Sequence, residues 1–322
     1  MLDTNAGAVG RPAPSRRELS GYHAWFLECA RMVDRAPVAH VVVAERHART
    51  DCLSPAPLEQ LAALAAATSH VRLGTYVLQP PLYPPVALLE RLAVIDHLSG
   101  GRLICGVGAG FHPDYFAVHE RPMTGRGAAL EEFLRLYRED WPHGRAGETY
   151  VPPPAQEPAP PLWVGGTSAP AVRRAARYAD AFAIGFNDRQ LSGLVERYRA
   201  ECAEAGTAPR LVLIKSVWVR GPGTDAAAEA GALFADTFGP EMDLYRAHGQ
   251  LHAAGAMHIE RLLRYAYVGD TAEVLRRVHE DVQRWGVDEI VMRVHIGVPP
   301  REAVADCLTA LVDEVISPLA LR

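Results

Sequence analysis

Two stretches of the chain combine glycines with residues that bind phosphate groups. Residues 99–102 read Ser-Gly-Gly-Arg, and residues 165–168 read Gly-Gly-Thr-Ser. A guanidinium forms charge-assisted hydrogen bonds with phosphate, and hydroxyl and main-chain N–H groups at the start of a helix also bind anions. We therefore predict a ligand that carries a phosphate, held by Arg102, Gly165, Gly166, Thr167 and Ser168.

Each stretch also has a simpler explanation. For Arg102 the alternative is a surface arginine that caps the end of a helix. Residues 165–168 suit an ordinary turn between a strand and a helix, in which Ser168 caps the helix and Pro170 lies in its first turn. The sequence leaves both explanations open.

Acid–base chemistry is indicated at two other strand ends. Glu45-Arg46-His47 follows an apolar run, and His295 ends a second run near the C-terminus. Histidine titrates near neutral pH, which suits it to proton transfer. We predict His47 and His295 as catalytic residues. A structural histidine that bonds the next loop is the alternative for His47, and Arg293 or His295 is a candidate to bind an anionic or enolic substrate.

The elements that position these residues alternate along the chain. Short apolar runs predict strands at 38–45, 71–78, 102–107, 162–165, 182–186, 211–219 and 290–295. Amphipathic patterns predict helices at 22–33, 57–68, 85–98, 128–141, 169–179, 189–205, 225–237, 271–285 and 301–316. Apolar strands separated by helices indicate a parallel sheet covered on both faces, either a (β/α)8 barrel or a doubly wound sheet.

Two motifs in this order resemble the bacterial-luciferase-like flavin-dependent monooxygenases. The first is the run 97–110, which continues from Arg102 into Gly106, Gly108 and Gly110, and the second is the run 161–170. The resemblance covers roughly residues 37–318. It implies a (β/α)8 TIM-type barrel in which Arg102 reaches the flavin phosphate and Gly106 faces a flat ring. It also implies a non-prolyl cis peptide near Thr75 and Tyr76, behind the isoalloxazine.

The resemblance further implies a reaction and its partners. A separate flavin reductase would supply reduced FMN, which reacts with O2 to give a C4a-peroxyflavin that oxygenates a small organic substrate. Segment 239–268 would be an insertion over the active-site mouth, or else an additional pair of surface helices. Two alternatives remain: an oxidoreductase that uses the deazaflavin F420, and a non-catalytic luciferase-like partner subunit. The Glu-Arg-His segment favours FMN, because F420 relatives more often carry Asp-His there.

The strand count departs from the family pattern. Seven strands are predicted where the family has eight, and the missing one would precede the helix at 22–33. Residues 1–20 show no strand pattern, so we expect an irregular N-terminal segment and a first strand that is absent or degenerate. The edge near 38–44 would then need cover, which predicts a homodimer. The whole chain, 1–322, is expected to be a single barrel domain.

Composition excludes several classes of protein. The chain has 322 residues, 49% hydrophobic and 22% charged, with a net charge of −5. These values are typical of a globular protein and argue against a nucleic-acid partner. We find no signal pattern and no apolar run near 18 residues, so we expect a cytoplasmic protein without a membrane segment. Five scattered cysteines, and histidines 248, 252 and 258 with spacings of four and six, do not predict a metal site.

Overall fold

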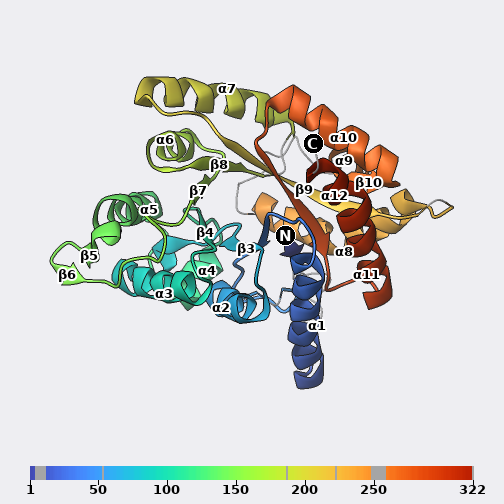
Figure 1. Ribbon diagram of the computed structural model, residues 1–322, viewed down its shortest axis with the longest axis horizontal. Coiled ribbons are helices and arrows are strands. Elements are labelled where there is room, and N and C mark those ends of the chain that lie inside the picture. Colours follow the sequence, from blue (N-terminus) through green and yellow to red (C-terminus); the bar gives the residue numbers. More distant parts are fainter. Residues whose placement is uncertain (4–11, 53, 186–187, 222, 248–258, 321–322) are drawn as a thin grey trace.

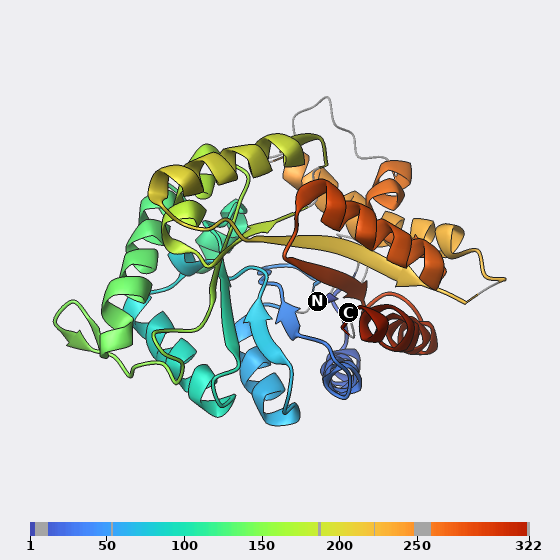
Figure 2. The ribbon, with the colours of Figure 1, turned by 45° about the horizontal axis from the view of Figure 1, so that its top comes forward.

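A nearly closed barrel of parallel strands forms the centre of the protein. The computed structural model describes residues 1–3, 12–52, 54–185, 188–221, 223–247 and 259–320. Eight strands form one sheet in the order β1, β11, β9, β8, β7, β4, β3, β2. The first and last of these contact each other, and helices surround the strands (Figures 1 and 2). The predicted (β/α)8 barrel is confirmed.

Strands and helices alternate along the chain, as the apolar runs predict. The barrel strands are β1 (Leu2–Asp3), β2 (His40–Val43), β3 (Arg72–Thr75), β4 (Leu103–Val107), β7 (Leu162–Gly165), β8 (Ala181–Ile184), β9 (Leu211–Val219) and β11 (Glu289–His295). The longer helices are α1 (Arg16–Asp34), α2 (Pro57–Ala67), α3 (Pro85–Leu98), α5 (Arg126–Arg135), α6 (Ala169–Tyr178), α7 (Asp188–Ala205), α8 (Ala226–Ala247), α10 (Thr271–Trp285) and α11 (Arg301–Ala310). Shorter elements are α4 (Pro113–Val118), the hairpin β5 (Arg145–Ala146) and β6 (Thr149–Tyr150), α9 (Ile259–Tyr265), β10 (Tyr267–Gly269) and α12 (Ser317–Ala320).

The barrel wall separates two hydrophobic layers. In β8, Ala181 and Ala183 belong to the cluster inside the barrel, whereas Phe182 and Ile184 pack in the layer between strands and helices. The inner cluster also contains Trp163 and residues from β2, β4, β9 and β11. Because both faces of each strand are buried, the strands read as continuous apolar runs rather than alternating ones.

The first strand is present but has only two residues. Leu2 pairs with Val294 and Asp3 pairs with His295 of β11, in parallel register. The strand alternates as a barrel strand should, because Leu2 packs in the outer layer while Asp3 faces Arg293 inside. The prediction of a degenerate first strand is therefore confirmed, but the expectation that residues 1–20 are irregular is wrong for this pair.

Helix α1 also begins earlier than the periodicity predicts. It starts at Arg16 rather than near residue 22, because Ser15 and Glu18 form a capping box. Residues 4–11 lie outside the described part of the chain. Since β1 contacts β2, the edge near residues 38–44 is covered within the chain. Among the described strands β2 pairs only with β3, so β1 contacts this edge without pairing to it. The homodimer stays a prediction.

Part of the predicted insertion at 239–268 is described. Helix α8 runs on to Ala247, past the predicted end at 237, and residues 248–258 lie outside the described range. Beyond them, β10 extends the sheet by pairing with β9, Tyr267 opposite Val217. Phe234 of α8 contacts the ring of His295, with ring centroids 5.8 Å apart. This helix therefore covers the carboxyl end of β11.

The short first strand places a carboxylate beside a buried arginine inside the barrel. The Asp3 carboxylate lies 3.4 Å from the Arg293 guanidinium and 3.4 Å from His295 Nδ1, and all three side chains are buried. We predict that Asp3→Ala lowers the free energy of unfolding by about 3–5 kcal/mol, because it leaves the buried Arg293 without its carboxylate. Urea unfolding followed by circular dichroism measures this. Glu90→Ala, on the exposed face of α3, is the control, and a loss below about 1 kcal/mol for Asp3→Ala would contradict the assignment.

Candidate active site

The carboxyl ends of four neighbouring strands form one side of the barrel mouth. These strands are β2, β3, β4 and β7, which are adjacent in the sheet. Active sites of (β/α)8 barrels lie at this end of the strands. With adjacent strands about 4.8 Å apart, the four ends span about 15 Å.

Arg102 lies at the other end of the barrel. It precedes β4, so it is about 13 Å along the strand from Gly106, at about 3.3 Å per residue. Its guanidinium donates to the carbonyl oxygens of Ala65 (3.1 Å), Thr68 (2.9 Å), Val71 (2.8 Å) and Ser99 (2.7 Å) and to the Thr68 hydroxyl (3.0 Å). These acceptors surround the end of α2. Contrary to the sequence prediction, Arg102 and residues 165–168 do not converge on one ligand, and the helix-capping interpretation describes its contacts.

Residues 165–168 do lie at the mouth. Ser168 is the N-cap of α6 and accepts a hydrogen bond from the Ala171 N–H at 3.4 Å. Gly166 has φ = +145°, and a Cβ there would collide with the Ala171 side chain, so only glycine suits this turn. The side chains of Thr167 and Ser168 are exposed. Hydroxyls, main-chain N–H groups and a helix start gather at this strand end, and such a donor set suits a phosphate.

An arginine near this end of the barrel is Arg126, which begins α5. Its Nε donates to the Gly110 carbonyl oxygen at 3.2 Å, so its guanidinium is held beside the glycine-rich exit of β4. No motif in the sequence points to Arg126. Only its position at the strand exits makes it a candidate site residue.

Strands β3 and β4 approach each other closely at Gly106. The Thr75 hydroxyl donates to the Gly106 carbonyl oxygen at 2.6 Å, and a Cβ on Gly106 would collide with the Thr75 carbonyl oxygen. The hydroxyl of Tyr76 reaches across the barrel to the carbonyl oxygens of Ile184 (3.0 Å) and Val212 (3.1 Å). Burial raises the pKa of Tyr76 far above its usual range. Both predicted side chains therefore bond to main chain inside the protein.

Val77 occupies the mouth itself, and sequence reasoning missed it. The peptide bond between Tyr76 and Val77 is cis, at the place that the resemblance implies. A Cβ on Gly108 would lie 2.9 Å from the Val77 side chain, and one on Gly165 would lie 3.4 Å from it. Val77 and these two glycines thus form an apolar floor that crosses the ends of β3, β4 and β7.

A buried carboxylate and two histidines lie at the end of β2. Glu45 accepts hydrogen bonds from the Gln79 N–H at 2.5 Å and from the Tyr83 hydroxyl. Its Oε1 is 3.2 Å from His47 Nε2. His47 Nδ1 is 3.4 Å from Nε2 of His119, which follows α4. The predicted His47 thus belongs to a line of three titratable groups, of which His119 was not predicted.

His295 lies apart from this group. It is fully buried at the end of β11, where it contacts Asp3 and Phe234 among others. Arg293 points the same way, as alternation predicts, and its Nε donates to the Ser216 hydroxyl at 3.2 Å. No interaction joins His295 to His47 among the described residues. The catalytic assignment of His295 stays a prediction.

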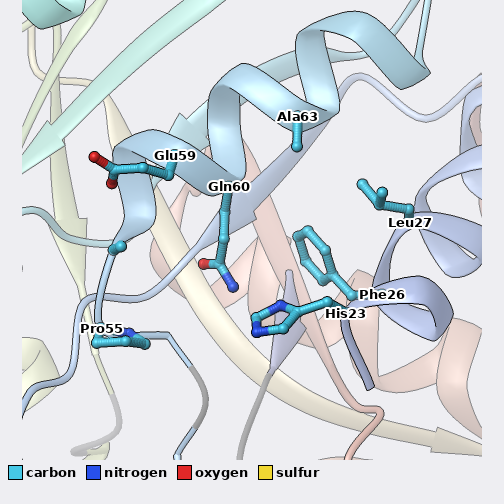
Figure 3. A pocket seen from close by; sticks show the side chains of 8 residues that line it. His23, Phe26, Leu27, Pro55, Glu59, Gln60 and Ala63 are labelled. Atoms are coloured by element: carbon cyan, nitrogen blue, oxygen red, sulfur yellow. The ribbon is translucent and has the colours of Figure 1, made fainter. Parts of the chain in front are cut away.

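One cavity of about 320 Å³ lies outside the barrel, between α1 and α2. Figure 3 shows His23, Phe26 and Leu27 of α1 facing Gln60 and Ala63 of α2 across it. Its walls carry few polar groups and none of the predicted site residues. It is therefore separate from the candidate site. Within the described ranges we find no group of three or more metal-binding side chains and no helix long and apolar enough to cross a membrane.

Comparison with known proteins agrees with this architecture. The model of the luciferase-like monooxygenase family matches residues 9–289. The chain belongs to the luciferase-like monooxygenase family. The four strand ends described above can therefore be compared with flavin-dependent relatives.

One relative in sequence and two solved structures with the same fold show what the chain is similar to. The oxygenase component of the flavin-dependent trigonelline monooxygenase of Acinetobacter baylyi is 27% identical over 65% of this chain, and the match spans only 62% of that relative. The oxygenating constituent of 3,6-diketocamphane monooxygenase from Pseudomonas putida, solved with FMN, has the same fold (18% identity, TM-score 0.77, 98% of both chains). The F420-dependent tetrahydromethanopterin reductase of Methanopyrus kandleri also shares it (17% identity, TM-score 0.65, 95% of this chain and 96% of that one).

The contacts of Arg102 make its role testable. We predict that Arg102→Ala lowers the free energy of unfolding by about 1.5–3 kcal/mol, because several carbonyl groups lose a charged donor. FMN affinity, measured by flavin fluorescence, should stay within twofold of the unsubstituted protein. Arg91→Ala is the control, since it removes an exposed ion pair with Glu59 and should cost no more than about 1 kcal/mol. A large loss of FMN affinity with unchanged stability would instead indicate that Arg102 contacts the cofactor.

Proposed function

We propose that this protein is the oxygenase component of a two-component monooxygenase. It would take reduced FMN from a separate reductase and use O2 to oxygenate a small organic substrate through a C4a-peroxyflavin. The observation that carries the proposal is the order of groups along four adjacent strand ends. The Glu45–His47 pair follows β2, an apolar floor crosses the ends of β3 and β4, and a turn with two hydroxyls and a helix start follows β7.

The residues present fit FMN. The exposed hydroxyls of Thr167 and Ser168 and the N–H groups at the start of α6 would hold its phosphate. The floor formed by Val77, Gly108 and Gly165 would face the isoalloxazine ring, because it offers a surface without polar side chains. FMN supplies the oxygen chemistry when bound, while the protein orients it and excludes water.

His47 would move protons at this site. Its Nε2 lies 3.2 Å from Oε1 of the buried Glu45. The Gln79 and Tyr83 hydrogen bonds fix the Glu45 carboxylate and hence the position of His47.

The F420-dependent neighbour supports a second candidate function. Such an enzyme would transfer hydride without oxygen and would use the same phosphate-binding turn. Equilibrium titration of the protein with FMN and with F420 separates the two, and we expect tighter binding of FMN. A missing first strand would favour the third alternative, a non-catalytic partner subunit. Since β1 is present, that argument no longer applies.

Thr167 tests the phosphate site without disturbing the helix cap. We predict that Thr167→Ala weakens FMN binding about tenfold, because a hydrogen bond to a charged group is lost. Binding of riboflavin, which lacks the phosphate, should not change. Thr271→Ala on α10 is the control. Equal losses for FMN and riboflavin would place the phosphate elsewhere.

His47 tests the chemical step. We predict that His47→Ala lowers the incorporation of ¹⁸O from ¹⁸O2 into substrate by about 10²–10⁴-fold, the usual contribution of an acid–base group. FMN affinity should change less than threefold, because such a group acts in the transition state. His70→Ala is the control, since that ring is 81% exposed and distant from the mouth. An unchanged rate of incorporation for His47→Ala would exclude His47 as the acid–base residue.

A further inference from the structure

We propose that Tyr76 is a positioning residue for the flavin ring, because its side chain ties the apolar floor to the opposite wall of the barrel. The proposal rests on the proposed function, since it takes the floor formed by Val77, Gly108 and Gly165 as the surface beneath the ring. Val77 directly follows Tyr76, and both residues are partly exposed. Whatever holds this segment therefore also fixes the floor.

Main-chain hydrogen bonds hold the segment from two neighbouring strands. The Tyr76 N–H donates to the Val43 carbonyl oxygen of β2 at 2.7 Å. The Leu78 N–H donates to the Gly106 carbonyl oxygen of β4 at 2.8 Å, and the Gly108 N–H donates to the Leu78 carbonyl oxygen at 2.8 Å. Since β2 and β4 flank β3, these ties lie on one side of the barrel. Two attachment points leave a chain free to tilt about the line that joins them.

The Tyr76 side chain supplies a third tie, from the other side of the barrel. Its hydroxyl lies 3.0 Å from the Ile184 carbonyl oxygen of β8 and 3.1 Å from the Val212 carbonyl oxygen of β9. In the sheet, β4 and β7 separate β3 from β8. A third attachment that is not in line with the other two removes the freedom to tilt. The floor is thus held from both walls of the barrel.

The surroundings of Tyr76 suit this role. Its ring packs against the cluster inside the barrel and lies edge-on to Trp163, with ring centroids 6.3 Å apart at 72°. Because burial raises the pKa of Tyr76 far above its usual range, the hydroxyl keeps its proton at neutral pH and remains a donor. A tyrosine hydroxyl has a single proton, so it donates to one of the two carbonyl groups at a time.

Small displacements of the floor matter to a flat ring. Dispersion contacts weaken steeply with distance, and a gap of about 0.5–1 Å loses about a quarter to a half of the attraction. A tilt of the segment at Val77 would open such a gap beneath part of the ring. The hydroxyls of Thr167 and Ser168 follow a different strand, β7, so loss of the Tyr76 tie should affect the ring and leave the phosphate contacts in place.

Hydrogen exchange of the protein without flavin tests the tie. In Tyr76→Phe, which removes only the hydroxyl, the main-chain N–H groups of Leu78 and Gly108 should exchange with water about three- to tenfold faster, the effect of one lost hydrogen bond. Nuclear magnetic resonance measures these rates. Tyr137→Phe is the matched control and should leave both rates within twofold. The Tyr137 hydroxyl also donates to a main-chain carbonyl, that of Pro160 at 2.9 Å, but Tyr137 lies in the layer outside the strands.

Flavin binding tests the effect on the ring. Tyr76→Phe should weaken the binding of FMN and of riboflavin by the same factor, about three- to tenfold, because both ligands carry the same ring. The visible circular dichroism of the bound flavin should change as well, since it reports how the ring lies against the protein. In Tyr137→Phe, the affinity and the spectrum should match those of the unsubstituted protein.

Either of two results would overturn the proposal. One is exchange at Leu78 and Gly108 that is unchanged in Tyr76→Phe, or equally faster in Tyr137→Phe. The other is faster exchange with unchanged flavin affinity and spectrum, which would make the hydroxyl a purely structural donor. Failure of the proposed function looks different, because the unsubstituted protein then binds F420 rather than FMN, and Tyr76→Phe weakens F420 binding by the same factor. Binding of neither cofactor would overturn both proposals.

Discussion

The close approach of β3 to β4 is the constraint on which the candidate site depends. Gly106 has no side chain, so the Thr75 carbonyl can lie where a Cβ would be, and the Thr75 hydroxyl bonds the Gly106 carbonyl. This contact brings the chain after β3 over β4, where Leu78 N–H donates to Gly106 and Gly108 N–H donates to Leu78. Val77 is thereby held across the glycines. A larger residue at position 106 would separate the strands and remove the floor.

The same segment also fixes the Glu45 carboxylate beside His47. One residue beyond Leu78, the main-chain N–H of Gln79 donates to Glu45, so the position of the carboxylate depends on the course of the chain after β3. Burial of the Glu45 carboxylate would be unfavourable without such hydrogen-bond donors. Gln79 and Tyr83 supply them from the segment that follows β3. The floor and the acid–base line are thus parts of one hydrogen-bonded structure rather than two independent sites.

The sequence predicts the barrel and part of the site for clear physical reasons. Apolar runs indicate strands because both faces of each strand are buried. The turn at Gly166 and Ser168 can be predicted because the residues that form it are neighbours in the sequence. Two residues are too few to show a periodic pattern, which is why β1 was not found. Arg102 was placed with the phosphate by resemblance, although it precedes β4 and so must lie at the amino end. Val77 and His119 are brought to the candidate site by contacts between distant segments, and a single sequence carries no signal for such contacts.

We propose that FMN lies along the ends of β2, β3, β4 and β7, with its phosphate at the start of α6. A crystal structure of the protein with FMN tests it most directly. We predict phosphate oxygens within about 3 Å of the Thr167 or Ser168 hydroxyls or of the N–H groups of that turn, the usual hydrogen-bond distance, and the ring against Val77. FMN with its phosphate beside Arg102, or bound in the cavity between α1 and α2, would contradict the account.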